Sequence, residues 1–381
     1  MDRVKTAFIG CGGIAGAHLR GLKILWENGI RTFEVIATCD IDGTRANKMA
    51  EDIALFQGYK PAVYTNVDEM LSYEPGLQAV DICTVHKDHH NLAIKCLDAK
   101  KHVIIEKPLA LTIRTGRMVL DSAEKNNCIL QVAENYRRAL SERTINWVIK
   151  EGRIGKLRML YWEDIFERLW YWGWRDHKEL SGGGWTLDGG VHFADLFRYH
   201  IGEVEEIYAI SKTYNPIRFK NKDLLIDPVE ITVEDTTMAT LKFENGVIGV
   251  WVLTNSAPGK QMNFRAIYGD KGCIVWNEGL YIGTDNIPRE QLEKEFMASL
   301  SSQEKDKFFP NGITDTIAIE LKEFYDAVLG KGEIETTGVV GLKDEAISMT
   351  VYESNFLNVP VKVKDVEGCK LENYQNQLIG G

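Results

Sequence analysis

The sequence predicts an α/β Rossmann domain followed by an α+β domain with a large, mostly antiparallel open sheet. A short apolar run at residues 5–9 leads into a glycine-rich turn at residues 10–15 and then into helical periodicity, which is the strand–turn–helix context of a dinucleotide-binding fold. Later in the chain the apolar runs lengthen and alternate with polar residues, as in an antiparallel sheet with one covered face. We therefore expect two domains, at residues 1–134 and 135–381.

Composition narrows the class of protein. The chain has 381 residues, of which 44% are hydrophobic, so it can bury a large core. It has no long uncharged apolar run, and charged residues lead directly into the first strand, so we expect neither a membrane span nor a signal peptide. The seven cysteines are scattered without a C-x-x-C pair, which favours reduced thiols in a cytoplasmic protein. A net charge of −10 argues against a nucleic-acid partner.

The glycine turn predicts where a dinucleotide binds. Gly10 allows the tight turn, and Gly12 lets the backbone approach a pyrophosphate without a Cβ in the way. The second strand, residues 33–39, ends at Asp40; an acid in this place accepts hydrogen bonds from ribose hydroxyls and repels a 2′-phosphate. NAD is therefore favoured over NADP, although Arg45 lies near enough in sequence to accept a phosphate.

The first domain continues as alternating strands and helices. The further predicted strands are residues 79–85, 101–105 and 129–133, and the predicted helices are residues 68–71, 86–96 and 112–126. His86 and His90 open one of these helices, but no H-E-x-x-H pattern or cysteine partner accompanies them, so we expect a surface or nucleotide-facing cluster and no metal. Pro108 biases Lys107 away from the helical region, which holds this lysine on the ligand-binding edge of the sheet.

The second half of the sequence predicts a sheet packed against helices. After a helix near residues 142–150, alternating apolar runs predict strands at residues 157–165, 205–214, 236–243 and 247–254. Glu244-Asn245-Gly246 and Gly269-Asp270-Lys271-Gly272 are hairpin turn signals between strands. We expect an antiparallel meander, with one face covered by helices.

Residues 170–195 are the chemically distinctive stretch of the second half. Five of the nine tryptophans lie in residues 162–185; clustered aromatics are more often core or interface, but here they flank glycines and charges, which suits a partly open site. A helix at residues 188–200 would place Asp188 and His192 on one face. A carboxylate beside an imidazole fixes its tautomer and raises its basicity, as a general base requires. In the alternative interpretation, Asp188 is an acid at the start of a helix and His192 is a buried histidine whose hydrogen bonds are satisfied, and neither residue is catalytic.

These motifs, in this order, resemble the Gfo/Idh/MocA oxidoreductases, which include glucose–fructose oxidoreductase and inositol dehydrogenases. The similar segments are GCGGIA at 10–15, Asp40, the histidine helix with His89, KHVIIEKPLA at 101–110, GGGWTLDGGVHFAD at 182–195 and YESNFLNVPVKV at 352–363. The lysine of E-K-P and the D-x-x-x-H pair are the specific part. The family combines a Rossmann domain with an α/β domain whose open sheet commonly serves oligomerisation, which implies a homo-oligomer, either a dimer or a tetramer.

The resemblance also implies roles for single residues. Lys107 would orient and polarise the reacting oxygen, His192 would exchange its proton, and Asp188 would position the pair and tune its charge. The residues implied to bind the cofactor are Gly10, Gly12, Gly13, Ile14, Asp40, Thr84, His86, His89, Glu106, Lys107, Trp174 and Arg175. The residues implied to bind the substrate are Lys107, Tyr136, Trp172, Trp174, Asp188 and His192. The chain departs from the family at residues 84–86, where it has Thr-Val-His and relatives often have Thr-Pro-Asn.

The resemblance implies NAD-dependent hydride transfer at a secondary alcohol or ketone of a sugar, polyol or glycoside. The most specific expectation is oxidation at C3 of a glucoside. Two alternatives stay open: an NAD-dependent glycosidase that oxidises its substrate transiently, and a non-catalytic nucleotide-sensing regulator on the same fold. A regulator would be expected to have lost Lys107, Asp188 and His192, and all three are present. The aromatic insertion at residues 170–174 belongs to a subgroup, so the identity of the substrate does not transfer.

Overall fold

The computed structural model describes residues 3–379, and the contacts among them define two compact units. The first unit contains the described residues up to Ala139 together with Ser302–Gly341, and the second contains Leu140–Ser301 and the described residues from Leu342 onward. The sequence suggested one boundary after residue 134, whereas here a distant segment returns to the first unit. Local patterns cannot show such a return, because it depends on contacts between residues far apart in the chain.

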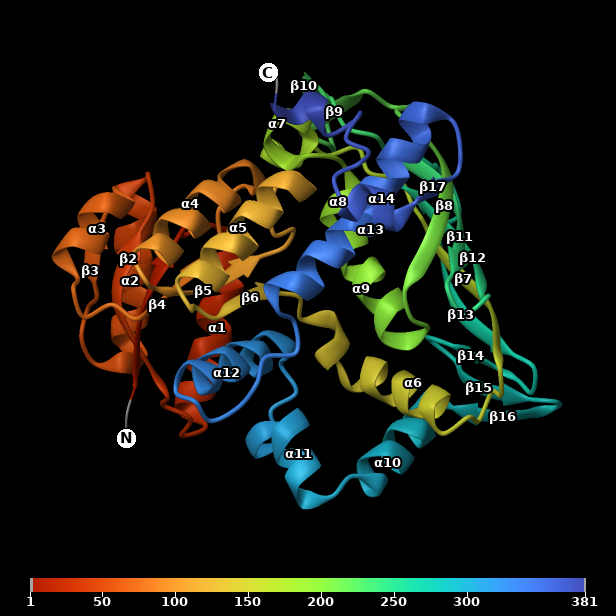
Figure 1. The fold of residues 1–381 in the computed structure, drawn as a ribbon, viewed down its shortest axis with the longest axis horizontal. Helices are drawn as coiled ribbons and strands as arrows, with labels where there is room; N and C mark the ends of the chain where they lie inside the picture. Colours follow the sequence, from red (N-terminus) through yellow and green to blue (C-terminus); the bar gives the residue numbers. More distant parts are fainter. Residues whose placement is uncertain (1–2, 380–381) are drawn as a thin grey trace. The chain divides into compact units, whose positions relative to one another are not determined.

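The first unit is built on a six-stranded parallel sheet in the order β3-β2-β1-β4-β5-β6 (Figure 1). Its strands are β1 Val4–Ile9, β2 Phe33–Cys39, β3 Ala62–Tyr64, β4 Ala79–Ile82, β5 His102–Glu106 and β6 Leu130–Ala133. The intervening helices are α1 Gly13–Glu27, α2 Gly43–Gln57, α3 Val67–Tyr73, α4 His86–Asp98 and α5 Ile113–Lys125. The predicted Rossmann fold is confirmed. The strand order reverses between β1 and β4, and such folds bind ligands at the carboxyl ends of the strands on either side of this reversal.

Helix packing and buried charge hold the returning segment on the first unit. This segment contains α11 Ser302–Phe308, η3 Pro310–Gly312 and α12 Thr316–Val328. Helix α12 packs so closely on α1 that a Cβ on Gly21 would lie 3.1 Å from the Ala318 nitrogen. Arg138, at the end of η1 Tyr136–Arg138, is fully buried and pairs with Glu323 at 2.5 Å and with Glu320 at 3.7 Å, both on α12.

The second unit is built on a nine-stranded sheet in the order β16-β15-β14-β13-β7-β12-β11-β8-β17. The strands are β7 Leu157–Ile165, β8 Val204–Lys212, β11 Thr236–Phe243, β12 Ile248–Thr254, β13 Met262–Gly269, β14 Cys273–Val275, β15 Gly279–Ile282, β16 Asp285–Pro288 and β17 Val361–Lys362. The helices are α6 Leu140–Lys150, α7 Lys178–Ser181, α8 Trp185–Asp188, α9 Gly190–His200, α10 Arg289–Ser299, α13 Gly338–Leu357, α14 Val363–Glu367 and α15 Asn376–Ile379, with η2 Gly173–Asp176 between β7 and α7. The mostly antiparallel sheet is confirmed.

The expectation of a pure antiparallel meander is wrong at one pair of strands. Strands β7 and β12 are parallel, with Trp162 opposite Trp251. Parallel neighbours cannot be joined by a hairpin and need a crossover connection. The chain between them leaves the sheet through η2, α7, α8 and α9 before it returns at β8, and this excursion contains the distinctive residues 170–195. The two hairpin turns predicted from sequence do join β11 to β12 and β13 to β14.

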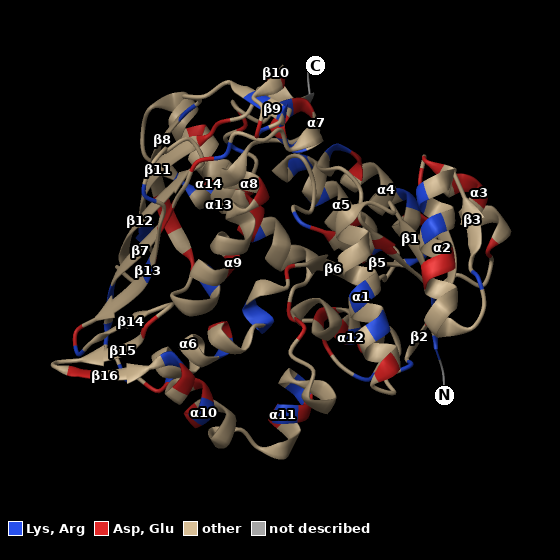
Figure 2. Cartoon of the chain, turned by 180° about the vertical axis from the view of Figure 1, so that it is seen from behind, with Lys and Arg blue, Asp and Glu red and all other residues tan. Residues whose placement is uncertain are grey.

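The two faces of this sheet differ in what covers them. Trp162 and Trp251 are fully buried on the inner face, and Phe197 of α9 stacks edge-on against both rings. Figures 1 and 2 show the helices of this unit gathered on that face, with no described helix on the other. The outer face instead carries partly exposed apolar side chains from neighbouring strands, namely Tyr161, Tyr208, Ile210, Met238, Ile248, Val250 and Met262.

Two smaller features complete the second unit. Strands β9 Ile217–Asn221 and β10 Ile226–Glu230 pair with each other as a separate hairpin, which the aromatic loop joins through a bridge between Trp170 and Phe219. Among residues 3–379, no helix has both the length and the apolar character needed to cross a membrane.

The buried charges of Arg138 give a test of how the returning segment is held. Arg138→Ala leaves Glu320 and Glu323 without their cation, and breaking a buried pair in this way typically costs about 3–5 kcal/mol of unfolding free energy. Urea denaturation measures this loss. The exposed Arg20→Ala is the matched control and should change stability by less than about 0.5 kcal/mol. Equal stability of the two variants would show that the segment does not depend on Arg138.

Candidate functional site

The turn after β1 has the geometry of a phosphate-binding loop. Gly10 has a φ of +85°, and a Cβ there would lie 2.5 Å from the Cys83 carbonyl oxygen, so only glycine fits. A Cβ on Gly12 or Gly13 would meet nothing within 4 Å, so the protein itself does not require glycine at these two positions. Gly12 is also the N-cap of α1, where no side chain accepts the first amide hydrogens. The open space and the uncapped amides fit a pyrophosphate, which would lie against Gly12, Gly13 and Ile14.

Asp40 lies at the end of β2 and is connected to this turn. Its Oδ2 accepts a hydrogen bond from the Cys11 amide at 2.7 Å, and its Oδ1 accepts one from the Asp42 amide at 2.8 Å. The carboxylate is therefore held beside the glycine turn with acceptor capacity left on both oxygens. This placement fits a carboxylate that receives ribose hydroxyls. Arg45, by contrast, is paired with Asp42 at 3.2 Å on an exposed surface.

The residues after β4 and β5 pack against one another and against the turn. The Thr84 side chain adjoins Gly10, since a Cβ on Gly10 would meet its methyl carbon at 2.9 Å. His89 is fully buried and donates from Nδ1 to the Pro108 carbonyl oxygen at 2.7 Å. Burial lowers the pKa of His89 to about 4, so the ring is neutral at physiological pH. His89 therefore holds the backbone of the E-K-P turn beside Lys107, which is itself partly exposed; the cofactor contacts expected of His86, His89 and Glu106 stay predictions.

A buried histidine that the sequence did not single out connects α1 to this turn. The imidazole of His18 bridges Asp81 of β4, at 2.8 Å from Nδ1, and Glu106 of β5, at 2.9 Å from Nε2. Burial alone would lower its pKa, but the charges and hydrogen bonds of Asp81 and Cys83 together outweigh burial and hold the pKa of His18 well above its ordinary value. Cys83 lies 3.3 Å from Asp81, so His18, Asp81 and Cys83 could also hold a metal ion. They satisfy one another by hydrogen bonds, and the absence of a metal stays a prediction.

In the second unit, the predicted helix at residues 188–200 is in fact two. Helix α8 ends at Asp188 and α9 begins at Gly190, so Asp188 and His192 do not share one regular helix. Gly189 itself keeps a right-handed helical conformation, so the interruption is one residue long. Close packing explains why positions 189 and 190 are glycines. A Cβ on Gly189 would lie 2.8 Å from the Trp185 ring, and one on Gly190 would lie 3.0 Å from the Trp251 ring. The junction of the two helices therefore lies directly against two indole rings.

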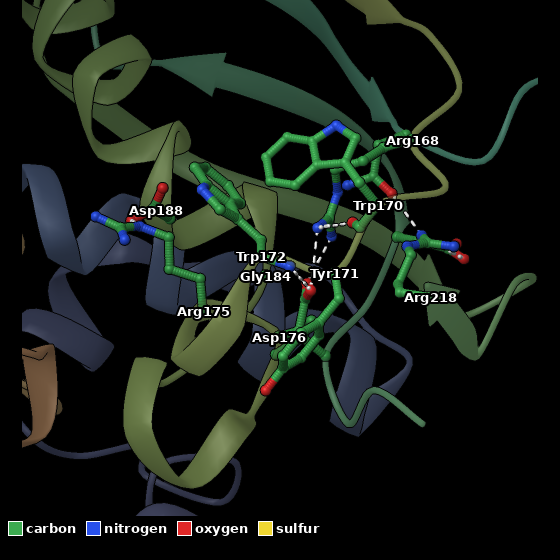
Figure 3. Close-up of polar contacts among 12 residues, drawn as sticks. Arg168, Trp170, Tyr171, Trp172, Arg175, Asp176, Gly184, Asp188 and Arg218 are labelled. Carbon is green, nitrogen blue, oxygen red and sulfur yellow. Dashed lines mark hydrogen bonds and ion pairs between the residues drawn. The ribbon is translucent and has the colours of Figure 1, made fainter. Parts of the chain in front are cut away.

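Asp188 and Arg175 form an ion pair beside the tryptophans (Figure 3). Nε of Arg175 lies 3.2 Å from Oδ1 of Asp188, and the guanidinium lies over the rings of Trp172 and Trp174, at 5.1 and 4.3 Å from their centroids. Asp188 is 5% exposed and His192 of α9 is 9% exposed. The ion pair thus places a cation directly beside the buried Asp188 carboxyl group.

A second, more deeply buried ion pair supports the tryptophan loop. Arg168 binds Asp176 with two hydrogen bonds, at 2.6 and 3.1 Å, and Asp176 also accepts the Trp172 amide at 2.6 Å. The Arg168 guanidinium lies 5.2 Å from the Trp170 centroid and 5.5 Å from the Trp172 centroid. Figure 3 shows the hydrogen bonds that join Arg168 to Asp176. Trp170, Trp172 and Trp174 are therefore partly exposed rings on a fixed loop and not members of the core, unlike Trp162 and Trp251.

The structure thus groups the predicted residues within each unit. In the first, Gly10, Asp40 and Thr84 meet at the turn; in the second, Trp172, Trp174, Arg175 and Asp188 form one cluster. Tyr136 is 39% exposed on η1 of the first unit. Two buried pairs that support these sites could not be predicted from the sequence, namely His18–Asp81 and Arg168–Asp176. No spacing rule pairs residues 63 positions apart, as His18 and Asp81 are. The R-x-W-x-W spacing around Arg168 was visible, but it does not by itself indicate a buried partner.

Comparison with known proteins shows which family the chain matches. Residues 4–134 match the oxidoreductase family with an NAD-binding Rossmann fold, and residues 143–275 match the GFO/IDH/MocA C-terminal domain. The chain is 27% identical to levoglucosan dehydrogenase of Pseudarthrobacter phenanthrenivorans, over 75% of this chain and 81% of that one. It is also 27% identical to D-glucoside 3-dehydrogenase of Escherichia coli, over 74% and 79%. A solved levoglucosan dehydrogenase with NADH and levoglucosan superposes with a TM-score of 0.76 at 23% identity, over 95% and 100% of the two chains.

The position of Asp40 predicts which dinucleotide is preferred. Asp40→Ser removes the charge that repels a 2′-phosphate, so the preference for NAD over NADP should shrink by the roughly 1–3 kcal/mol typical of a charged hydrogen bond. Fluorescence titration with each dinucleotide measures the two affinities. Asp52→Ser, an acid paired with Lys48 on the surface of α2, is the control and should leave the ratio unchanged. An unchanged ratio in Asp40→Ser would mean that Asp40 does not face the ribose.

Proposed function

Because the chain belongs to the Gfo/Idh/MocA family of NAD-dependent oxidoreductases, we propose that it transfers a hydride at a secondary alcohol or ketone of a sugar, polyol or glycoside. In its most specific form, the reaction is oxidation at C3 of a glucoside. The names of two relatives, levoglucosan dehydrogenase and D-glucoside 3-dehydrogenase, support a carbohydrate substrate. The observation that carries the proposal is the open, uncapped Gly12–Gly13 turn beside Asp40, in a chain that keeps the E-K-P lysine and the D-x-x-x-H pair.

Two side chains would act on the reacting oxygen. Bound NAD⁺ supplies the hydride acceptor. His192 takes the hydroxyl proton in the oxidative direction, and the Lys107 ammonium donates a hydrogen bond to the developing alkoxide. A compact cation placed where negative charge accumulates stabilises the transition state more than the substrate. The same two groups act in reverse when a ketone is reduced, with His192 returning the proton.

Asp188 would position and tune this pair. It is buried and paired with Arg175, so its position is fixed before substrate binds. An anion close to an imidazole favours the protonated ring and so strengthens it as a base. Trp172, Trp174 and Tyr136 are proposed to contact the substrate, and Trp174 and Arg175 the cofactor, as the resemblance implies. Within residues 3–379, no disulfide joins any of the seven cysteines, which supports the proposal of a reducing, cytoplasmic location.

Measuring NADH tests the reaction class directly. The purified protein is incubated with NAD⁺ and a panel of levoglucosan, inositols, aldoses and alkyl glucosides, and NADH absorbance is followed. We expect stoichiometric NADH with at least one neutral sugar or glycoside. Release of a reducing sugar without NADH would instead indicate an NAD-dependent glycosidase. Tight NAD binding with neither product across the panel would contradict an enzymatic role.

Substitution of the two proposed catalytic groups should affect chemistry more than folding. Lys107→Ala should lower kcat by roughly 10²–10³, the usual loss for one stabilising donor, and His192→Ala by about 10²–10⁴. Because both groups act on one oxygen, the double variant should lose less than the product of the two single effects. Steady-state kinetics gives kcat, while melting temperature and NAD affinity are the controls and should change little. Near-normal kcat in His192→Ala at neutral pH would remove His192 from the mechanism and point to Tyr136 or a solvent-fed base.

The outer face of the nine-stranded sheet is proposed as a homo-oligomer interface. It carries a shallow hollow of about 370 Å³ lined by Met159, Tyr161, Tyr208, Thr240, Ile248, Val250 and Pro360, among others. Ile248 and Ile210 are 59% and 48% exposed on neighbouring parts of this face. An uncovered apolar face of this extent is more typical of an interface than of a free surface.

A charge on this face should separate the subunits. Ile248→Lys would bury an unpaired ammonium in the interface, so we expect a dimer or tetramer to become smaller, as measured by light scattering after size-exclusion chromatography. Leu55→Lys, on an α2 residue that is 86% exposed, is the matched control and should leave the mass unchanged. A monomeric wild-type protein, or an unchanged oligomer in Ile248→Lys, would rule out this interface.

A further inference from the structure

Two tryptophans of the second unit are rigidly held and yet open to solvent. The Arg168 guanidinium contacts both the Trp170 and the Trp172 ring, and it also donates to the Trp170 carbonyl oxygen at 3.1 Å. Arg168 is 4% exposed and Asp176 is fully buried, whereas Trp170 is 39% exposed. Backbone hydrogen bonds of Phe219 with Leu169 and Tyr171 fix the same loop to β9. The loop therefore presents an exposed indole in one orientation.

This rigidity is not explained by packing alone. Burying an ion pair has a desolvation cost, and apolar residues of similar size are often at least as stabilising. If the loop served only to complete the core, Trp170 would be expected to be buried like Trp162. A ring that is fixed in advance loses little conformational freedom when a ligand stacks on it, which is the usual advantage of a rigid aromatic contact.

The charges around the rings indicate which ligands suit them. Arg168 is neutralised by Asp176, and Arg175 by Asp188. A phosphate or carboxylate bound to either guanidinium would compete with a carboxylate that is itself buried. Removing the partner of a buried charge is costly. The rings therefore suit an uncharged group with a flat apolar face, such as the C–H face of a sugar ring or an aromatic ring.

The contacts also give an order along the cluster. Arg175 contacts both Asp188 and the Trp172 ring, so its guanidinium alone lies between Trp172 and the proposed catalytic carboxylate. Trp170 lies next to Trp172, with 5.5 Å between ring centroids, and is the more exposed neighbour of Arg168. A substrate whose reacting sugar is at Asp188 and His192 would extend over Trp172 and then Trp170.

We propose that Trp170 and Trp172 form a subsite for the uncharged group attached to the oxidised sugar, which is the aglycone or second sugar ring of a neutral glycoside. This inference rests on the proposed oxidation of a sugar hydroxyl at His192 and adds what lies beyond that sugar. The physiological substrate is then an extended neutral glycoside and not a free monosaccharide, a sugar phosphate or a uronic acid.

A comparison of two glucosides tests the subsite. The ratio of kcat/KM for para-nitrophenyl glucoside to that for methyl glucoside should fall about three- to tenfold in Trp170→Ala, the range expected for one aromatic contact. Trp170→Phe keeps a flat ring and should restore most of the ratio. Trp147→Ala is the matched control, because Trp147 is also a partly exposed ring with a guanidinium, Arg153, at 5.4 Å, and it should leave the ratio unchanged. An unchanged ratio in Trp170→Ala, or an equal fall in Trp147→Ala, would overturn the subsite.

Two further measurements separate the subsite from the reaction. Para-carboxyphenyl glucoside should have a lower kcat/KM than the nitrophenyl compound, and a preference for the carboxylate would contradict the neutral class. Calorimetric titration of the NADH-loaded protein, in which no oxidation occurs, should show aryl glucoside binding that weakens in Trp170→Ala. Binding without turnover would support the subsite and refute the proposed reaction; oxidation of simple sugars with an unchanged ratio would support the reaction and refute the subsite.

Discussion

Both groups of site residues depend on backbone segments that approach their neighbours more closely than a side chain permits. At the first, a Cβ on Gly10 would strike the Cys83 carbonyl, so β1 and β4 can end side by side. At the second, a Cβ on Gly183 would overlap the Tyr352 hydroxyl, and one on Gly184 would overlap the Glu234 backbone. Glu234 also accepts the Gly184 and Thr186 amides, which fixes the start of α8. Without this close approach, neither loop would present its polar groups where the structure has them.

Buried charge is used in the same way at both sites. His18 is held between Asp81 and Glu106, and Arg168 is bound to Asp176, so each buried carboxylate has a cation in hydrogen-bond contact. Such pairs contribute little net stability, but removing one partner is costly, and this makes alternative loop arrangements unfavourable. His18, Asp81 and Glu106 come from α1, β4 and β5, so their contacts also fix the position of these elements relative to one another. Arg168 and Asp176 lie in the same loop, and their pair fixes its shape.

Sequence patterns predicted the features that depend on neighbouring residues. The strands at 33–39, 157–165 and 236–243 have the predicted bounds, because alternation and apolar runs are local properties. What the sequence could not supply depends on distant contacts: the parallel pairing of β7 with β12, the return of residues 302–341 and the buried pairs. The close packing at Gly189 and Gly190 could not be predicted for the same reason, since the rings that exclude a side chain there are known only from the fold. The role of His18 had no local signal at all.

The parallel pair of strands explains why the chemistry of the second unit lies in one excursion of the chain. A crossover between β7 and β12 must pass over one face of the sheet, and here it passes over the face that carries Trp162 and Trp251. Those two rings support Phe197 and Gly190 of α9, the helix that carries His192. The tryptophan loop of the crossover is anchored by the Arg168–Asp176 ion pair and by backbone hydrogen bonds to β9. The sheet thus positions the proposed base, while the tryptophan loop has anchors of its own. Loops on a rigid scaffold are where one fold commonly varies to serve different substrates.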